Sequence, residues 1–183
     1  MPTYPRTIEN GSGEILTFLG IVRNQTGDRL EAEAHAQPAA GPPMHVHHLQ
    51  EEGMTVVTGK LGYQIVGGPE RDAGPGETAV FAPGVAHRWW NAGTSELHCT
   101  GWVKPPLNVE YFLTALFDST KRNGRGRPAI SDAAFLVTRY GSEYGLLTIP
   151  SLVRRLTFPI IVALGRTLGK YERFRDAPKP IAE

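Results

Sequence analysis

GPPMHVHHLQEEGMTVVTG occupies residues 41–59, and GETAVFAPGVAHRWWN occupies residues 76–91. Both stretches are rich in glycine and proline, and they carry His45, His47 and His87. In an extended strand, residues two apart point to the same face, so the imidazoles of His45 and His47 are expected to point the same way. Three imidazoles delivered from separate strands are typical ligands of one divalent transition metal.

A carboxylate completes the predicted ligand set. Glu51 and Glu52 both follow the paired histidines, and only one of them can face inward beside them. His48 is expected to face away from the site. Imidazole and carboxylate ligands without a nearby thiolate suit Fe, Mn, Ni, Co or Zn and argue against an iron–sulfur cluster. The sequence therefore predicts one divalent metal ion whose identity it does not specify.

Residues 14–104 are expected to form β-structure. Short strand-like segments alternate with turn signals rich in glycine, proline and asparagine. RLEAEAHAQ (29–37) alternates strictly between polar and apolar residues, as a half-buried strand does. Many short strands with tight turns favour a β-sandwich or barrel. The expected strands are 14–22, 29–37, 54–66, 78–82, 87–91 and 97–103.

The pattern becomes helical after Pro105-Pro106. In residues 108–124, apolar side chains recur three and four positions apart, which predicts a helix with one buried stripe, an N-cap at Asn108 and a stop at Gly124. Residues 131–140 and 150–171 are also expected to be helical, and Pro159 should kink or split the last helix.

The two quoted motifs resemble those of the cupin superfamily. His45, His47, Glu52 and Gly59 follow the spacing of the first cupin motif, which makes Glu52 the matching ligand. In the second motif, Gly76, Gly84, His87 and Asn91 are in register. The resemblance covers roughly residues 30–104. Two turn positions depart from it, because Ala39 stands where the first motif has glycine and Ala82 where the second has proline.

The resemblance implies a mainly β fold, a cupin-type double-stranded β-helix (jelly-roll) barrel with C-terminal α-helices. We expect the barrel to span residues 1–105. Residues 106–183 would be a helical C-terminal extension that packs on the barrel or on a partner subunit. The implied metal ligands are His45, His47, Glu52 and His87, and Glu52 is also the catalytic candidate because a carboxylate can serve as a base.

The strand pattern also predicts a largely apolar substrate pocket. Trp89 shares the strand face of His87, and a tryptophan there could hold a flat substrate or simply pack in the core. His35 could supply a polar group at the pocket, although a structural role is the alternative. The wall residues expected around the metal are Trp89, Phe81, Tyr63, Met54 and His35.

Three functions are compatible with such a site. The favoured one is a metal-dependent oxidoreductase of the dioxygenase type that acts on a small enolisable or aromatic substrate. The alternatives are a non-redox metal-dependent isomerase, lyase or cyclase, and a non-enzymatic cupin that binds a small molecule.

Composition and charge bear on location and partners. The chain has one cysteine, Cys99, which excludes an internal disulfide and is expected to be a buried hydrophobe. We find no secretory signal or membrane-spanning run and expect a cytoplasmic protein. Residues 121–183 carry an excess of basic side chains and the preceding part an excess of acidic ones. We expect a small-molecule substrate, a homodimer and no nucleic acid, and we favour packing of the basic helices on protein over contact with an anionic membrane surface.

Overall fold

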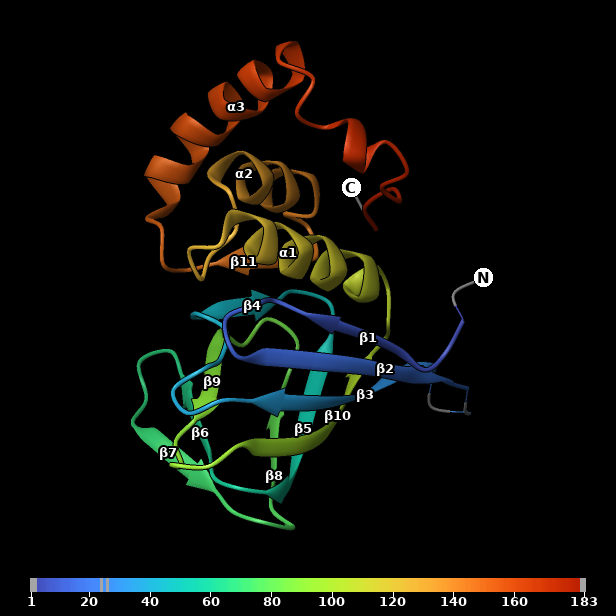
Figure 1. The fold of residues 1–183 in the computed structure, drawn as a ribbon, viewed down its shortest axis with the longest axis vertical. Helices are drawn as coiled ribbons and strands as arrows, with labels where there is room; N and C mark the ends of the chain where they lie inside the picture. Colours follow the sequence, from blue (N-terminus) through green and yellow to red (C-terminus); the bar gives the residue numbers. More distant parts are fainter. Residues whose placement is uncertain (1–2, 24, 26, 182–183) are drawn as a thin grey trace.

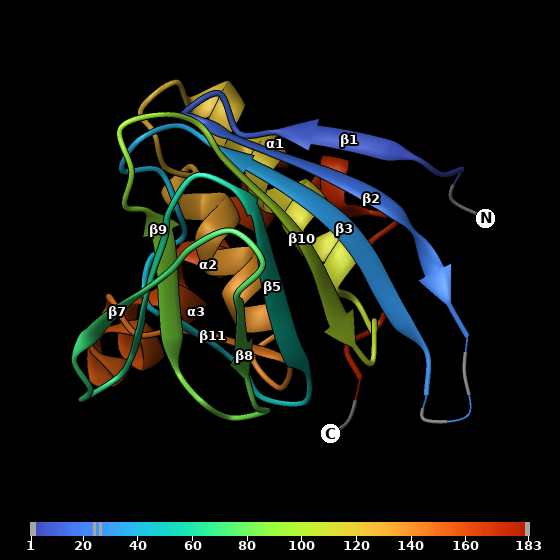
Figure 2. The ribbon, with the colours of Figure 1, turned by 90° about the horizontal axis from the view of Figure 1, so that it is seen from below.

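The computed structural model describes residues 3–23, 25 and 27–181, and it shows two antiparallel sheets facing each other with helices at one end (Figures 1 and 2). The six-stranded sheet has the order β1 (Arg6–Glu9), β2 (Glu14–Val22), β3 (Arg29–Ala36), β10 (Leu97–Lys104), β5 (Glu51–Thr58) and β8 (Thr78–Phe81). The five-stranded sheet has the order β11 (Tyr144–Leu146), β4 (His45–His47), β9 (His87–Asn91), β6 (Leu61–Ile65) and β7 (Glu70–Ala73). The predicted mainly β fold with C-terminal helices is confirmed.

The space between the sheets is filled by alternate side chains of their strands. On β10, Leu97 and Cys99 are buried while His98 between them is partly exposed, which is the two-residue period of a strand with one face in the core. Cys99 is a free, buried thiol as predicted, and burial raises its pKa to about 12. The buried barrel core consists of Ala36, Met54, Val56, Leu61, Ala73, Ala79, Phe81, Trp89, Leu97 and Cys99.

The helices are α1 (Val109–Asn123), α2 (Ile130–Arg139) and α3 (Ser151–Thr167), followed by a short 3-10 turn at Glu172–Phe174. Gly124 ends α1 in the left-handed conformation at φ 62°, as predicted. Asn108 precedes α1 but makes no side-chain cap, because its amide donates instead to Glu143 Oε1 at 2.7 Å. Pro159 lies within α3 and does not split it.

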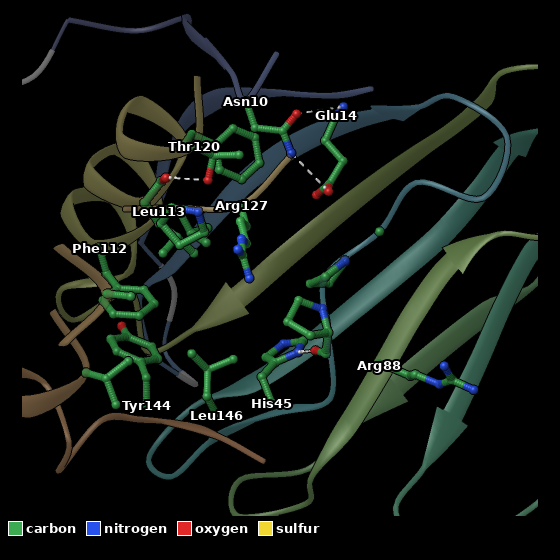
Figure 3. Close-up of a pocket in the computed structure, with 18 of the residues that line it drawn as sticks. Asn10, Glu14, His45, Arg88, Phe112, Leu113, Thr120, Arg127, Tyr144 and Leu146 are labelled. Atoms are coloured by element: carbon green, nitrogen blue, oxygen red, sulfur yellow. Dashed lines mark hydrogen bonds between the residues drawn. The ribbon is translucent and has the colours of Figure 1, made fainter. Parts of the chain in front are cut away.

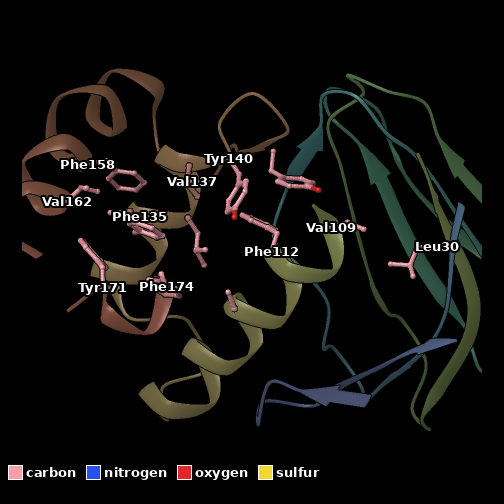
Figure 4. Close-up of a cluster of buried hydrophobic side chains, with 14 of the residues drawn as sticks. Leu30, Val109, Phe112, Phe135, Val137, Tyr140, Phe158, Val162, Tyr171 and Phe174 are labelled. Atoms are coloured by element: carbon pink, nitrogen blue, oxygen red, sulfur yellow. The ribbon is translucent and has the colours of Figure 1, made fainter. Parts of the chain in front are cut away.

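A second buried cluster joins the helices to the barrel (Figure 4). Phe18 and Leu30, from β2 and β3, belong to the same cluster as Val109 and Phe112 of α1 and Phe158 of α3. The helical part thus packs against the six-stranded sheet of its own chain. The proposed division of the chain at residue 105 stays a prediction.

The helical part also adds a strand to the barrel. β11, between α2 and α3, pairs antiparallel with β4, so that Tyr144 lies opposite His47 and Leu146 opposite His45. The strand that carries two predicted metal ligands is therefore hydrogen-bonded on one side to β9 and on the other to the extension.

The segment after the helices is tied to them by hydrogen bonds. Arg139 donates to the carbonyl oxygens of Ala177 and Pro178, at 2.8 and 2.9 Å through Nη2. The backbone N–H of Ile181 donates to Glu143 Oε1 at 2.9 Å, and Glu143 is fully buried. The carboxylate of Glu143 thus links the start of α1 to the end of the described chain.

Candidate metal centre

Four predicted ligands converge at one end of the barrel. His45 and His47 lie on β4, Glu52 lies at the start of β5, and His87 lies on β9 directly opposite His45. The Nε2 atoms of His87, His47 and His45 lie 3.1, 3.4 and 3.9 Å from Glu52 Oε2. Ligand atoms of His45, Glu52 and His87 all lie within 4.8 Å of one another, and His47 joins them through its contact with Glu52. Glu51 makes no contact with this group among the hydrogen bonds and ion pairs of the described residues.

The Nδ1 atom of each histidine is already engaged. His45 Nδ1–H donates to the carbonyl oxygen of Pro43 at 2.8 Å, and His87 Nδ1–H donates to that of Val85 at 2.9 Å. His47 Nδ1 lies 3.2 Å from Gln50 Oε1. Because these partners are acceptors, they assign the proton to Nδ1 and leave Nε2 as a lone pair on each ring.

This tautomer makes the donor set fit a cation. With its proton on Nδ1, His87 presents a lone pair to a carboxylate oxygen of Glu52 only 3.1 Å away. Two acceptors at that distance repel each other unless a proton or a metal ion lies between them. Imidazoles that ligate metals through one nitrogen while the other is held by a carbonyl or carboxylate are the usual arrangement in metalloproteins. His45, His47, Glu52 and His87 therefore fit a divalent ion.

Burial sets the ionisation of the site. Burial opposes ionisation of Glu52, but hydrogen bonds that His45 and His87 donate when their Nε2 atoms also carry a proton, together with the charge of the nearby imidazoles, outweigh it and hold the pKa of that carboxyl well below its usual range. Burial lowers the pKa of His47 to about 4, against a smaller opposing effect of Glu52. Near neutral pH the site thus holds a carboxylate beside a neutral His47, which is the protonation that metal binding requires.

Gln50 positions His47 and was not singled out from the sequence. It is fully buried, and its amide donates to the carbonyl oxygen of Pro106 at 2.9 Å and to the Tyr144 hydroxyl at 3.0 Å. These two bonds fix the amide so that its oxygen faces His47. Nothing in the spacing around Gln50 signals this role, because the two groups to which its amide donates lie more than fifty residues away.

Aromatic rings support two of the imidazoles. The Phe81 ring stacks on His87 with a centroid distance of 3.8 Å, and Tyr63 packs edge-on against Phe81. Tyr144 of β11 meets His47 edge-on at 5.3 Å. Phe81 and Tyr63 thus lie behind the ligands and are not among the described residues that line the cavity in front of them.

His45, His47 and Glu52 border a cavity of about 1760 Å³ between the barrel end and the helices (Figure 3). Of the predicted wall residues, Met54 and Trp89 border it, and His35 adjoins its edge with its side chain on the outer face of the sheet. Its helical side, which the sequence did not indicate, is mostly apolar. That side includes Phe112, Leu113, Leu116, Tyr144 and Leu146.

Arg127, which is exposed to solvent, places a positive charge at this cavity. It lies in the loop between α1 and α2, and its side chain extends into the cavity (Figure 3). Within the part of the chain that the structure describes, Arg127 forms no ion pair, whereas the other cavity arginine drawn there, Arg88, is paired with Glu70 at 2.7 Å. The cavity thus combines an apolar wall, a predicted cation site and an uncompensated guanidinium.

Residues 32–103 match the family model described as "Cupin domain". Residues 32–103 therefore carry a cupin domain, and the barrel has the two-sheet double-stranded β-helix fold that the motifs predicted. The match leaves α1, α2, β11 and α3 outside it. No curated protein matches the chain.

Several solved structures match about half of the chain. An uncharacterized conserved protein with a double-stranded beta-helix domain from Klebsiella pneumoniae is 21% identical, with a TM-score of 0.43 over 57% of this chain and 82% of that one. A sugar phosphate isomerase from a cupin superfamily of Silicibacter pomeroyi is 19% identical, with a TM-score of 0.43 over 51% of this chain and 60% of that one. The Cupin_2 domain of an XRE family transcriptional regulator from Enterobacter cloacae is 19% identical, with a TM-score of 0.42 over 51% of this chain and 98% of that one.

No helix among residues 3–23, 25 and 27–181 has the length and apolar character needed to cross a membrane.

Proposed function

We propose that this chain is a metal-dependent cupin enzyme, a dioxygenase-type oxidoreductase that acts on a small enolisable or aromatic substrate. The observation that carries the proposal is the arrangement of three Nε2 lone pairs around Glu52 Oε2, with every Nδ1 held by an acceptor. A bound Fe, Mn, Ni, Co or Zn ion would supply Lewis acidity and, for the redox-active ions, electron transfer to oxygen.

The chain's own residues would bind and orient the substrate. Phe112, Leu113 and Leu146 present apolar surface that excludes water and suits a flat ring. Arg127 would pair with an anionic oxygen of the substrate at the far side from the ligands. Glu52, ionised near neutral pH, would hold the proton that an enolisable substrate gives up.

Oxygen uptake tests this proposal. Metal-free protein is loaded separately with Fe(II), Mn(II), Ni(II), Co(II) and Zn(II) and offered a diketone, a flavonol and a catechol. We expect oxygen consumption with at least one redox-active ion, and none with the His45→Ala variant or with Zn(II). His48→Ala is the matched control, because His48 is the exposed neighbour and, among the described residues, its side chain forms no hydrogen bond or ion pair with the cluster. Consumption that is absent throughout, or unchanged by His45→Ala, contradicts the proposal.

Arg127 favours a second candidate, a non-redox isomerase, lyase or cyclase. An unpaired guanidinium facing a metal site is suited to an anionic substrate whose enolate is stabilised without oxygen. Turnover by the Zn(II) form under strictly anaerobic conditions would support this candidate. A chain whose thermal stability is unchanged by metal and chelator would instead support a non-enzymatic binding protein.

A further inference from the structure

A second group of metal-ligating side chains lies away from the candidate centre, on β3 and β10. One ligand atom from each of Glu33, His35 and His98 lies within 4.8 Å of the others. We propose that these three residues form a separate binding site for a divalent first-row transition ion on the outer face of the six-stranded sheet.

The alternation of both strands places this cluster on the outer face. Ala36 on β3 is buried in the barrel core, as are Leu97 and Cys99 on β10. His35 and His98 are the immediate neighbours of these residues, so their side chains leave the opposite side of the sheet. The sheet therefore separates this cluster from Glu52, whose side chain points inward.

Both clusters have the same arrangement on their strands. In the barrel, His45 and His47 are two apart on one strand, and His87 lies directly opposite His45 on the antiparallel neighbour. On the outer face, Glu33 and His35 are two apart on β3, and His98 lies directly opposite His35 on β10. Two side chains at positions i and i+2 of one strand lie close to the side chain opposite them on the neighbouring antiparallel strand. Three such side chains are close enough to bind one ion.

His35 is oriented as a metal ligand is. Its Nδ1 lies 3.0 Å from Glu96 Oε1, and the other oxygen of Glu96 accepts a hydrogen bond from Gln37 Nε2 at 3.0 Å. A carboxylate on one ring nitrogen fixes the tautomer and leaves Nε2 of His35 for the ion. The carboxylate also raises the basicity of the ring, which strengthens its bond to a metal.

His98 is held beside it. The two imidazole rings stack with a centroid distance of 4.3 Å and an interplanar angle of 10°. His98 Nε2 is shielded from solvent and has no hydrogen-bond partner among the described residues. No hydrogen bond within that part of the chain therefore competes with an ion for this nitrogen.

The charges around the cluster favour a cation. Glu33 and Glu96 contribute two carboxylates. The residues directly across from the ligands in the sheet carry no positive charge, and they are Thr17 and Thr100 beside Glu33, Ile15 beside His35 and Thr58 beside His98. Two imidazoles and one carboxylate suit Zn(II), Cu(II), Ni(II) or Co(II), and their partial exposure leaves room for water to complete the coordination.

The test is the number of Zn(II) ions bound per chain. Metal-free protein is titrated with Zn(II) at pH 7.5 against a chromophoric chelator, for wild type and the variants His98→Thr and Glu33→Gln. We expect His98→Thr to bind one equivalent fewer than wild type, and Glu33→Gln to bind that equivalent at least 10-fold more weakly. Thr100→Val is the matched control on the same face and should leave the titration unchanged. The Co(II) absorption spectrum of His45→Ala should retain the bands of an imidazole-ligated ion.

The outcomes distinguish this site from the candidate centre in the barrel. If His98→Thr is folded by circular dichroism and still binds as many Zn(II) ions as wild type, the proposal is overturned. If His45→Ala loses the Zn(II) ion that His98→Thr retains, that loss concerns the barrel site alone. If the oxygen-uptake proposal fails, the difference in the number of bound Zn(II) ions between wild type and His98→Thr still tests the outer-face site.

Discussion

The side-chain amide of Gln50 decides which nitrogen of His47 faces Glu52. It accepts from His47 and donates to Pro106 and Tyr144, so it satisfies three groups in a space without water access. We expect Gln50→Leu to weaken Zn(II) binding in the barrel site by about 10- to 100-fold, as loss of an outer-shell partner does. The measurement is chelator competition, with Gln64→Leu on β6 as control. An unchanged affinity would show that Gln50 has no positioning role.

Strand parity alone left Glu51 and Glu52 as equal candidates, the cupin motif spacing selected Glu52, and the contacts of Glu52 agree with that choice. Glu52 Oε2 lies within 3.9 Å of all three Nε2 atoms. We expect Glu52→Gln, which keeps the shape but removes the charge, to lower Zn(II) affinity by roughly 100-fold or more, because carboxylate charge is lost from the ligand set. Glu51→Gln should change it less than twofold. Equal effects in isothermal titration would contradict this assignment.

His47 makes the folding stability of the metal-free protein depend on pH. The ring titrates near 6.5 when exposed, whereas burial lowers the folded pKa to about 4. Between these values the unfolded chain binds a proton that the folded chain does not, so stability present above pH 6.5 is lost as the pH falls toward 4. The loss is on the order of 3 kcal/mol.

Urea unfolding of metal-free protein between pH 7 and 4 measures this loss. His47→Gln should show a flatter profile over the same range, because the buried titrating ring is gone. Further loss below pH 4 is expected from Glu52, whose depressed pKa stabilises the fold only while the carboxyl is ionised. A wild-type profile as flat as that of His47→Gln contradicts the prediction.

At the scale of elements, the pairing of β11 with β4 is the contact that sequence reasoning missed. The HVH strand was predictable, because its alternation and its flanking glycine and proline are local signals. β11 has only three residues, and its strand partner lies about a hundred residues earlier in the chain, so no local period reveals it. β7 was also missed within an expected turn, and the expected strand 54–66 is a hairpin of β5 and β6.

Gly145 tests whether β11 supports the metal ligands. A Cβ at this position would lie 2.8 Å from Val46 Cγ1 and 3.2 Å from His48 Nε2. Gly145→Ala should therefore push β11 away from β4, cost about 1–3 kcal/mol of stability and weaken metal binding at His45 and His47. Gly74→Ala is the control, because its Cβ would come no closer than 3.7 Å to the Glu77 carboxylate. A stable variant with unchanged Zn(II) affinity would show that β11 is dispensable to the site.

At the scale of the whole molecule, the barrel supplies one wall of the cavity and the helical part supplies the opposite wall. The ligand set could be predicted from two sequence motifs, because the ligands within each motif lie close together in the sequence. The wall opposite them comes from α1 and β11, and Arg127 comes from the loop after α1. These residues meet the barrel through the pairing of β11 with β4 and through the buried cluster of Phe18, Leu30 and the helices, and no short-range pattern predicts either contact.

The same packing leaves one side of α3 uncovered. Leu152, Leu156, Ile160, Leu164 and Leu168, spaced four apart, are between 58% and 68% exposed. Large apolar side chains on one helix side form a continuous strip, and monomeric proteins rarely expose such strips without a partner. We predict that a second copy of the chain covers it in a homodimer.

Light scattering across a concentration series measures the oligomeric state. Wild type is expected at twice the chain mass, and the double variant Leu156→Glu with Ile160→Glu at the mass of one chain, because two buried carboxylates would oppose association. Ile130→Glu, an equally exposed apolar residue at the start of α2, is the control and should remain dimeric. Arg155 and Arg166 on the same helix make an anionic surface the competing partner. A wild-type chain that is monomeric and sediments with phosphatidylglycerol vesicles at low salt, but not when Leu156 and Ile160 are replaced, would assign the strip to a membrane surface and contradict the dimer.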